Sequence, residues 1–495
     1  MQTDVAVLGG GMAGMATALR LQARGVRTVL LEAHGHAGGC AGYWRHRGFS
    51  FDVGATTLVD FEPGGVGAEL LDSVGMGPVI GEALPGYQAW LPDRTVRLHR
   101  DQAAWHAERL RAFGDDEAHR RFWRFLDTVS DGFWRASRSG VRLPLRHPAD
   151  LLANARAIGL RHAPLARHLN ATLGGALRRH GLRGDAALCG LLGMLVEDTV
   201  HSDLDDAPLI NAALGVTIRG AGLTRHEGGM HGLWRRLVTH YRSLGGELRT
   251  ASLVTGVEGR AGAFTVRTAR ATIGARCVVS ALPAESTSTI FGGTVARRLA
   301  PFLARDTQRL GGAIVVFLGV PDSDVSGPDL THHQLLQDYA APLGDGNNMF
   351  VSVSAPGDLL SAPAGHRAVM ISTHTSLATW SGLTPEEHTL HRTEIGERLL
   401  GLARRAYPRL GEAPLVESTA TPRAFARYAF RPHGAVGGVR QTPRHTNLHA
   451  IPHDLGVPGV RLVGDSTWPG LGTVACVIGS RIVADDIRRE LRRAR

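Results

Sequence analysis

Alternation of apolar and polar stretches at the start of the chain predicts a strand, a turn, a helix and a second strand. Residues 4–8 form a short apolar run, residues 9–14 are rich in glycine, and residues 15–24 have helical spacing that ends at Gly25. A second apolar run covers residues 26–32. This order predicts a β-α-β unit with two parallel strands.

Further along the chain the pattern changes twice. Residues 101–183 predict arginine-rich helices that are interrupted by proline and glycine, and strand-like alternation returns after them. The expected strands are residues 247–257, 263–279, 311–320, 347–354, 367–374 and 460–463, and a closing helix ends near Leu491. We therefore predict an α/β fold, in which a Rossmann-like domain is combined with a discontinuous second domain made of a mixed sheet and a helical part.

The composition is that of a folded chain with more than one domain. A chain of 495 residues is longer than a domain with a single hydrophobic core commonly is. Hydrophobic residues make up 43% of it, as in ordinary folded proteins. The four cysteines lie far apart without a CxxC pair, which indicates neither a disulfide framework nor a zinc site. His445, His449 and His453 recur at helical spacing, but Pro443 and Pro452 bracket them, so we predict no metal site.

The chain is basic, with a formal net charge of +10, and all of its basic residues are arginine. The lack of lysine excludes Schiff-base catalysis and anchoring of pyridoxal phosphate. No zinc-finger, basic-zipper or RNA-recognition signature accompanies the charge, so we expect no nucleic-acid partner. Between Arg135 and Arg183 ten arginines stand against one acid, Asp150. That stretch is either a solvated helical face or a segment that meets an anionic membrane surface.

The pattern Gly9-x-Gly11-x-x-Gly14 predicts a site for a dinucleotide. Gly9 permits the turn, Gly11 lets the backbone approach the phosphates, and Gly14 lets the helix and strand pack closely. The pyrophosphate then lies at the positive end of the helix that follows. Glu32 closes the second strand, where a carboxylate can accept hydrogen bonds from the hydroxyls of the adenosine ribose.

Three further segments favour FAD over NAD as the cofactor. Gly38-Gly39 and residues 48–54 follow the ribose acid, and a distant segment covers Gly464 to Thr473. Asp465 at a strand end suits a ribityl or phosphate contact. The helix that begins near Thr473 directs its positive end toward the flavin, which favours the anionic reduced form. The sequence therefore predicts FAD bound by both ends of the chain.

By these motifs the chain resembles the carotenoid desaturase and isomerase branch of the flavin amine oxidase superfamily. The resemblance is carried by VAVLGGGMAG, LLEAHGHAGGCAGYWRHRGFSFDVGATTLVDFEPGG, LTRHEGGMHGLWRRL and LVGDSTWPGLGT. Within that branch, FDVGATTLVDFEPGG and QTPRHTNLHAIPHDLGVPGVRLVGDST are most similar to carotenoid C-3′,4′ desaturases. The chain departs from the family pattern at three places. Cys40 stands where phytoene desaturases usually have Arg or Lys, and Trp468 stands where a smaller or imidazole side chain is expected. Ala281-Leu282-Pro283 replaces a commoner Asn-Ala pair.

The motifs and the resemblance together give the expected cofactor-binding residues and domains. Val254 enters through the resemblance alone, which implies that its backbone holds the adenine. The expected set is Gly9, Gly11, Met12, Ala13, Gly14, Glu32, Ala33, Gly38, Gly39, Gly54, Ala55, Thr56, Val254, Gly464, Asp465, Gly472, Thr473 and Val474. The FAD-binding domain is expected in residues 1–95, 223–300 and 436–495, a helical, membrane-facing region in 96–222, and the sheet of the substrate domain in 301–435.

The resemblance implies FAD-dependent desaturation of a carotenoid at C-3,4 (C-3′,4′). The alternatives are a carotenoid cis-trans isomerase using reduced FAD, a flavin amine oxidase, which the lack of lysine disfavours, and a flavin-binding carotenoid carrier without activity. His226 and Glu227 are the candidates for a catalytic base, although a surface ion pair is the favoured interpretation. The resemblance also implies that substrate approaches between residues 227–230 and 434–438.

A carotenoid resides in the bilayer, so we prefer the membrane interpretation of the arginine-rich stretch. The first strand begins too early to leave room for a signal peptide, and the longest apolar run, residues 186–196, is about half of a membrane span. We therefore expect a peripheral protein on the cytoplasmic face of the cell membrane, or a cytoplasmic one. The sequence predicts no particular oligomeric state.

Overall fold

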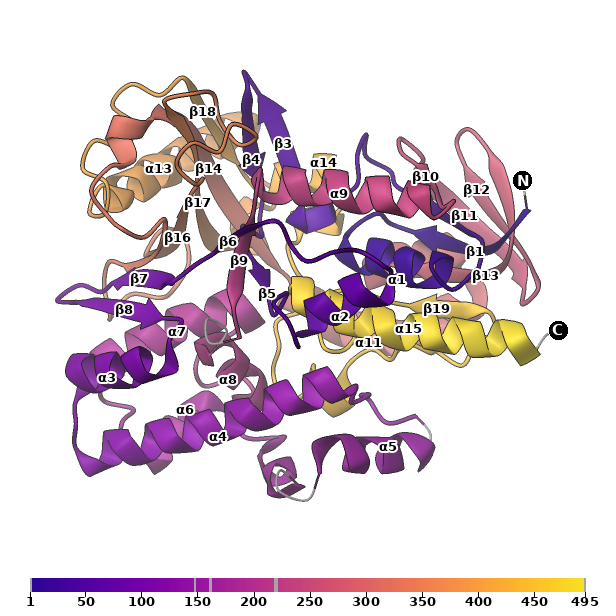
Figure 1. Cartoon of the computed structure of the whole chain (residues 1–495), viewed down its shortest axis with the longest axis horizontal. Coiled ribbons are helices and arrows are strands. Elements are labelled where there is room, and N and C mark those ends of the chain that lie inside the picture. The colour runs from indigo at the N-terminus through magenta and orange to yellow at the C-terminus, as the bar shows by residue number, and fades with distance from the viewer. Residues whose placement is uncertain (1, 147, 160–162, 218–220, 494–495) are drawn as a thin grey trace.

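Two seven-stranded sheets carry the fold, with helices packed beside and below them (Figure 1). The structure is a computed structural model that describes residues 2–146, 148–159, 163–217 and 221–493. The first sheet has the order β10-β2-β1-β13-β12-β11, and β19 pairs with β13. Its strands are β1 (Gln2–Leu8), β2 (Thr28–Leu31), β10 (Glu247–Arg249), β11 (Val254–Arg260), β12 (Ala263–Thr268), β13 (Thr272–Ser280) and β19 (Val460–Leu462).

The central strand β1 is parallel to β2 on one side and to β13 on the other. Successive side chains of a strand point to opposite faces, so Val5 and Val7 pack into one core and Ala6 and Leu8 into another. A parallel strand that is buried on both faces has a continuous apolar sequence. This explains why the first β-α-β unit is predictable, and the structure confirms it.

Helices cover both faces of this sheet. Helices α1 (Met12–Gln22) and α15 (Thr473–Arg493) pack side by side on one face with Val5 and Val7, whereas α10 (Ala284–Phe291) and α11 (Gly293–Asp306) pack on the other with Ala6 and Leu8. The closing helix is therefore confirmed. The expected strand 247–257 is two strands, because the chain turns at Ala251, which has a positive φ of 48°.

The second sheet has the order β18-β14-β17-β16-β15-β7-β8, and helix α13 (Pro385–Ala403) packs on it. Its strands are β7 (Gly86–Trp90), β8 (Thr95–His99), β14 (Gly311–Pro321), β15 (His332–Leu336), β16 (Asn348–Val353), β17 (His366–Ser376) and β18 (Val416–Ala420). Strand β7 pairs in parallel with β15. The first stretch of the Rossmann-like domain therefore ends before β7, earlier than the expected boundary at residue 95.

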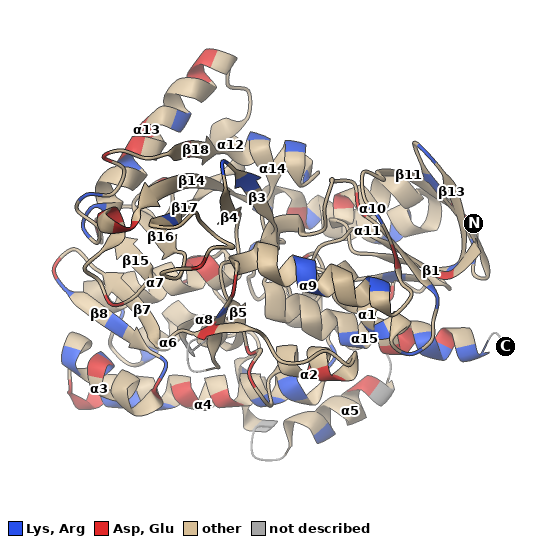
Figure 2. Ribbon diagram, turned by 45° about the horizontal axis from the view of Figure 1, so that its top comes forward, with Lys and Arg blue, Asp and Glu red and all other residues tan. Residues whose placement is uncertain are grey.

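A helical layer lies below the second sheet in Figure 1. It contains α3 (Gln102–Phe113), α4 (Glu117–Ser139), α5 (Pro148–Ile158), α6 (Leu173–Arg179), α7 (Ala186–Val200) and α8 (Leu209–Thr217). Acidic and basic positions alternate along α3 and α4 (Figure 2). Several arginines of the basic stretch pair with acids from outside it, as Arg138 does with Asp60 and Arg142 with Asp486. No helix of the described residues is long and apolar enough to cross a membrane.

Small elements connect these layers. Strand β3 (Tyr43–His46) pairs with β4 (Phe49–Asp52), and β9 (Leu223–His226) lies between β5 (Leu58–Val59) and β6 (Gly81–Ala83). The remaining helices are α2 (Val66–Ser73), α9 (Gly229–Ser243), α12 (Leu377–Trp380) and α14 (Pro422–Tyr428). Helix α9 begins directly after β9 and packs against β4. The β4 end and the α9 start are thereby held together.

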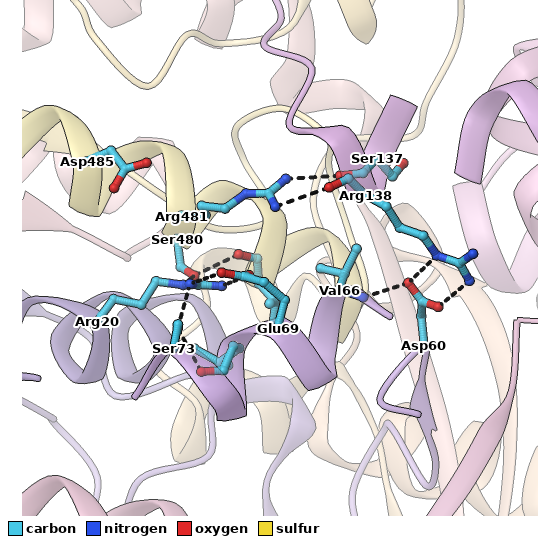
Figure 3. A network of polar contacts seen from close by, with 12 residues as sticks. Arg20, Asp60, Val66, Glu69, Ser73, Ser137, Arg138, Ser480, Arg481 and Asp485 are labelled. Atoms are coloured by element: carbon cyan, nitrogen blue, oxygen red, sulfur yellow. Dashed lines mark hydrogen bonds and ion pairs between the residues drawn. The ribbon is translucent and has the colours of Figure 1, made fainter. Parts of the chain in front are cut away.

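A buried arginine network holds α1, α2 and α15 together (Figure 3). The Arg20 guanidinium is fully buried and donates to both Glu69 carboxylate oxygens, at 2.9 and 2.6 Å. It also donates to the hydroxyls of Ser73 and Ser480, at 2.9 and 3.2 Å. All of these acceptors lie on α2 or α15. The network fixes the angle at which the C-terminal helix meets the N-terminal one.

Replacing Glu69 by alanine tests this network. Glu69→Ala leaves a buried guanidinium without its countercharge, and we expect the free energy of unfolding to fall by about 3 kcal/mol. The matched control is Glu117→Ala, whose exposed ion pair with Arg124 contributes about 0.5 kcal/mol or less. Chemical denaturation of both variants measures the difference. Equal losses for the two variants would contradict a stabilising role for the network.

Candidate functional site

The turn between β1 and α1 leaves helix N–H groups open to an anion. Helix α1 begins after Gly11 with no capping side chain and no acidic residue in its first turn. A side chain at Gly14 would collide with the carbonyl of Gly9, so glycine is required where the helix approaches the strand. The free N–H groups and the helix dipole both favour a negatively charged group. A pyrophosphate suits this position.

Glu32 follows β2 and is held by two backbone donors. The Gly10 N–H donates to Glu32 Oε2 at 2.7 Å, and the His34 N–H donates to Oε1 at 2.7 Å. Burial raises the pKa of Glu32, and the hydrogen bonds from His34 and Gly10 act in the opposite direction. The carboxylate is therefore fixed beside the glycine turn, where an acid that binds a ribose is expected.

The second glycine pair lies directly against the first turn. The Gly38 N–H donates to the Gly10 carbonyl at 3.0 Å, and Gly11 and Gly38 form an isolated parallel bridge. A Cβ atom at Gly39 would lie 3.2 Å from the Cα atom of Gly11. Gly39 therefore suits this position, because its backbone approaches Gly11 closely and has a φ of +57°.

Gly54, Ala55 and Thr56 continue the same surface. A side chain at Gly54 would collide with the Cys40 carbonyl, and the Thr56 carbonyl accepts a hydrogen bond from Arg225 Nη1 at 3.3 Å. Arg225 Nη1 also lies 2.9 Å from Asp52 Oδ2 in a buried ion pair. This pair holds the segment that carries Gly54.

The C-terminal segment from Gly464 to Val474 meets the N-terminal turn. A Cβ atom at Gly464 would lie 3.8 Å from the Ala13 Cβ atom. Gly472 has a φ of +98° and open space on its Cβ side, and Thr473 and Val474 begin α15. We call this group of neighbouring segments the glycine site; it comprises residues 9–14, Glu32, 38–39, 54–56 and 464–474.

Val254, the expected adenine contact, begins β11. The preceding residues are tied to the Glu32 segment, because the Ser252 N–H donates to the Glu32 carbonyl and the Ala251 N–H to the His34 carbonyl, both at 2.8 Å. Ala33 lies between these two acceptors. The Val254 side chain is 7% exposed and packs in the core. Its backbone is near the ribose acid, and its contact with adenine stays a prediction.

Sequence reasoning did not single out Arg431, which forms a partly buried ion pair with Asp465. Arg431 Nη2 lies 2.9 Å from Asp465 Oδ2, and the guanidinium also donates to the Ala435 and Gly437 carbonyls at 2.9 Å. Burial lowers the pKa of Arg431, but the charge of Asp465 opposes burial and the pKa is raised overall. Among so many arginines in the sequence, nothing local marks this one.

Arg431 also lies close to Cys40, the position at which the chain departs from the Arg or Lys of similar proteins. The charge of Arg431 acts on the Cys40 thiol, whose pKa is raised by burial. The structure therefore brings a cation from a distant segment near the place where a local one is missing. Burial likewise raises the pKa of Cys476 to about 12, so both thiols stay neutral.

Asp52 and the start of α9 form a second unit, and sequence reasoning did not predict the contact between them. The Met230 N–H donates to Asp52 Oδ1 at 2.7 Å, beside the Arg225 ion pair. A Cβ atom at Gly229 would lie 2.5 Å from the same oxygen. The glycine pair of this motif thus lets the start of α9 approach a buried carboxylate.

His226 and Glu227, the candidates for a catalytic base, lie on a pocket of about 500 Å³ that also includes Leu360 and Arg235. None of the expected cofactor residues lines this pocket. His226 Nδ1 is 2.6 Å from the Glu227 carbonyl, and burial lowers the pKa of His226. The turn that follows them packs on Asp52 and Leu360, whereas residues 434–438 pack on His201 and Asp465. An approach of substrate between the two segments stays a prediction.

The three histidines at helical spacing are separate in the structure. His445 Nδ1 is 2.6 Å from Thr442 Oγ1, whereas His453 Nδ1 is 2.8 Å from the Leu462 carbonyl. The described residues contain no group of three or more His, Cys, Asp or Glu side chains arranged to hold a metal ion.

Comparison with known proteins agrees with this geometry. Residues 7–74 match the NAD(P)-binding Rossmann-like domain family. The chain is 23% identical to the chloroplastic prolycopene isomerase of Arabidopsis thaliana, over 99% of this chain and 83% of that protein. It is 26% identical to a phytoene dehydrogenase of Streptomyces griseus, over 98% of this chain and 94% of that protein.

Solved structures show the same fold in flavin amine oxidases. Cyclohexylamine oxidase from Brevibacterium oxydans superposes with a TM-score of 0.62 over 99% of both chains, at 16% identity. Wild-type putrescine oxidase superposes with a TM-score of 0.63 over 99% of both chains, at 15% identity. The fold class expected from the sequence is thereby confirmed. Together these comparisons show that the chain is similar over nearly its whole length to carotenoid isomerases and desaturases, and that it has the fold of the amine oxidases.

Proposed function

We propose that the chain is an FAD-dependent enzyme that desaturates a carotenoid at C-3,4. The observation that carries the proposal is the glycine site, in which the Gly9–Gly14 turn and the Gly464–Val474 segment meet. An enzyme that binds NAD alone needs only the first of these segments. The second segment supplies Asp465 and the start of α15 at the end of the site where a flavin ring would lie.

Oxidised FAD, when bound, would supply an acceptor for one hydride, which carries two electrons. The chain's own residues have three tasks beside it. The α1 N-terminus would bind the pyrophosphate, Glu32 would bind the ribose, and the ion pairs Asp52–Arg225 and Asp465–Arg431 hold the segments that carry Gly54 and Gly464. Asp52 and Arg225 are buried, so water is excluded around their pair.

The carotenoid substrate is proposed from the names of the relatives and from the C-3′,4′ desaturase pattern in residues 51–65 and 441–467. A competing proposal is a carotenoid cis-trans isomerase that uses reduced FAD. It is favoured by the similarity to the prolycopene isomerase along 99% of the chain. The two reactions use the same cofactor and differ in their products.

The mass of the product separates these two functions. We expect purified enzyme with FAD, incubated with a hydroxylated acyclic carotenoid, to give a product lighter by two hydrogen atoms with one more conjugated double bond. Mass spectrometry and the red shift of the polyene absorption measure it. A product of unchanged mass and altered retention would support the isomerase instead. Unaltered carotenoid after incubation with either oxidised or reduced FAD would reject both proposals.

We also propose that the α5 region contacts an anionic membrane, at the cytoplasmic face of the cell. Leu145, Leu151 and Leu152 are 40%, 61% and 55% exposed. Arg146 and Arg156 lie in the same region. Exposed leucines beside arginines suit the boundary between acyl chains and anionic headgroups. A substrate that resides in the bilayer would reach the enzyme from there.

Substitution of the exposed leucines tests the membrane proposal. We expect Leu151→Asp/Leu152→Asp to weaken binding to anionic phospholipid vesicles by at least about tenfold, because each buried leucine contributes about 1.5 kcal/mol or more. The control is Leu390→Asp on α13, where the leucine is 71% exposed. Vesicle co-sedimentation measures binding. Binding that is the same for all three proteins, or absent in the wild type, would reject this surface.

A further inference from the structure

A buried cluster of ionisable groups lies beside the glycine site and has no part in binding the cofactor as described above. It consists of Glu197 and Asp198 in the last turn of α7, His201 directly after that helix, and His374 on β17. Helix α7 packs against β15 of the second sheet. The cluster therefore lies where the helical layer meets the second sheet.

His201 has a backbone conformation that disfavours its residue type. It caps α7 with φ 56° and ψ 31°, the left-handed region in which glycine or asparagine is usual. For a residue with a Cβ atom, this conformation lies about 1 kcal/mol above the right-handed one. A strained backbone persists where the surrounding structure imposes it, and such positions are frequent at functional sites. The strained backbone at His201 therefore indicates a function for its imidazole.

The His201 ring faces the segment that carries Asp465. A Cβ atom at Gly437 would lie 2.5 Å from His201 Cε1 and 3.2 and 3.3 Å from its two ring nitrogens. A side chain at the next residue, Gly438, would collide with the Asp465 carbonyl. The edge of the imidazole that carries both nitrogens is thus separated from the glycine site by two glycines.

His201 Nδ1 is buried and makes no hydrogen bond among the described residues. An unpaired buried nitrogen costs free energy unless a ligand or a proton uses it. His201 as a whole is 7% exposed. The chain thus keeps an unpaired ring nitrogen buried behind Gly437, next to the segment that carries Asp465.

His374 and the acids hold the His201 ring from behind. The two imidazole rings meet edge to face, with centroids 4.6 Å apart. His374 Nε2 lies 3.5 Å from Asp198 Oδ1, and Gln334 on β15 hydrogen-bonds to Asp198. Asn348 on β16 donates to Glu197 Oε2 at 2.6 Å. Side chains on two neighbouring strands, β15 and β16, therefore hold the two acids that lie beside His374.

The charges around the cluster favour a neutral His201. Burial lowers its pKa well below the usual value, and the positive charges of His374, Arg440 and Arg431 lower it further. Burial also lowers the pKa of His374, but the hydrogen bond to Asp198 and the charges of Glu197 and Asp198 raise it overall. Burial raises the pKa of Glu197, against the charge of His374. His201 is thus uncharged near neutral pH, with one of its two ring nitrogens unprotonated, and the shift of His374 favours its positively charged form.

We propose that His201 is the base of the desaturation, and that it accepts the proton from the carbon next to the one that gives up hydride. The inference rests on the proposed function. One carbon transfers hydride to the oxidised flavin, which gains two electrons. The neighbouring C–H bond then breaks, its electron pair forms the new C=C bond, and its proton goes to His201 Nδ1.

A weak base is sufficient for this step. Loss of hydride from a polyene leaves a delocalised cation, and a C–H bond next to such a cation is strongly acidic. A neutral imidazole that is hard to protonate can still accept this proton, and the nearby positive charges then promote its release for the next turnover. His374 is a positioning residue, since it acts through the orientation and pKa of His201.

His201→Asn is the direct test, because asparagine tolerates the left-handed backbone but does not titrate. With carotenoid in detergent micelles and no oxygen, we expect the rate of flavin reduction to fall by about 100-fold or more, which is what a lost general base costs. The FAD affinity should stay within about twofold of the wild type, since general-base loss acts on the chemical step alone. The matched control is His433→Asn, because His433 has the same φ of 56° but is an exposed residue outside the cluster.

Two further readouts separate a base from a structural histidine. His201→Gly accepts the backbone and leaves space for a free imidazole, so added imidazole should restore flavin reduction. The wild-type rate should decline in acid as His201 becomes protonated, and His374→Gln should move this decline to higher pH because a positive charge is lost. The His201→Asn rate should show no such decline.

The outcomes are distinct. If no carotenoid reduces the wild-type flavin, the proposed function fails. If the wild type is reduced but His201→Asn reacts within about threefold of it, far short of the loss a general base predicts, the inference about His201 is overturned while the proposed function stands. If His201→Asn folds poorly, the imidazole response of His201→Gly decides: restored reduction supports the base, and an unrestored slow rate in a protein that binds FAD rejects it.

Discussion

The packing of α15 on α1 is the contact on which the rest of the site depends. It joins residues 460 positions apart, as the hydrogen bond from Arg20 Nε to Ser480 Oγ shows. Through it Gly464 comes to the first turn of α1, which places the segment that carries Asp465 beside the glycine turn after β1. Under the proposed function, both ends of the chain must therefore fold before the cofactor can bind fully.

Two buried arginines and a partly buried one hold the segments of this site, each by pairing with one acid. Arg20 pairs with Glu69 beneath α1 and α15, Arg225 with Asp52 beside Gly54, and Arg431 with Asp465. A guanidinium suits this use, because it stays charged and donates several hydrogen bonds in a fixed geometry. The arginines thus connect elements that are distant in sequence, and their abundance is a structural resource as well as a source of net charge.

The sequence predicts the features that local chemistry decides. The first β-α-β unit follows from a strand buried on both faces and from glycines at which a side chain would collide with the backbone. The closing helix is predictable because its helical pattern is long. The pairing of β7 with β15 could not be predicted, because alternation with period two does not specify a partner strand. Asp465–Arg431 and His201–His374 were missed because their members are far apart along the chain.

The claim that both ends of the chain hold one FAD is tested most directly by comparing FAD with ADP, which fills only the N-terminal half of the site. Titration calorimetry of the FAD-free protein with each ligand, in the wild type and in Asp465→Asn, gives the four affinities. We predict that the wild type binds FAD far more tightly than ADP. We also predict that Asp465→Asn weakens the affinity for FAD by about tenfold or more and leaves the affinity for ADP unchanged. Equal affinities in the wild type, or equal losses for both ligands, would contradict the account.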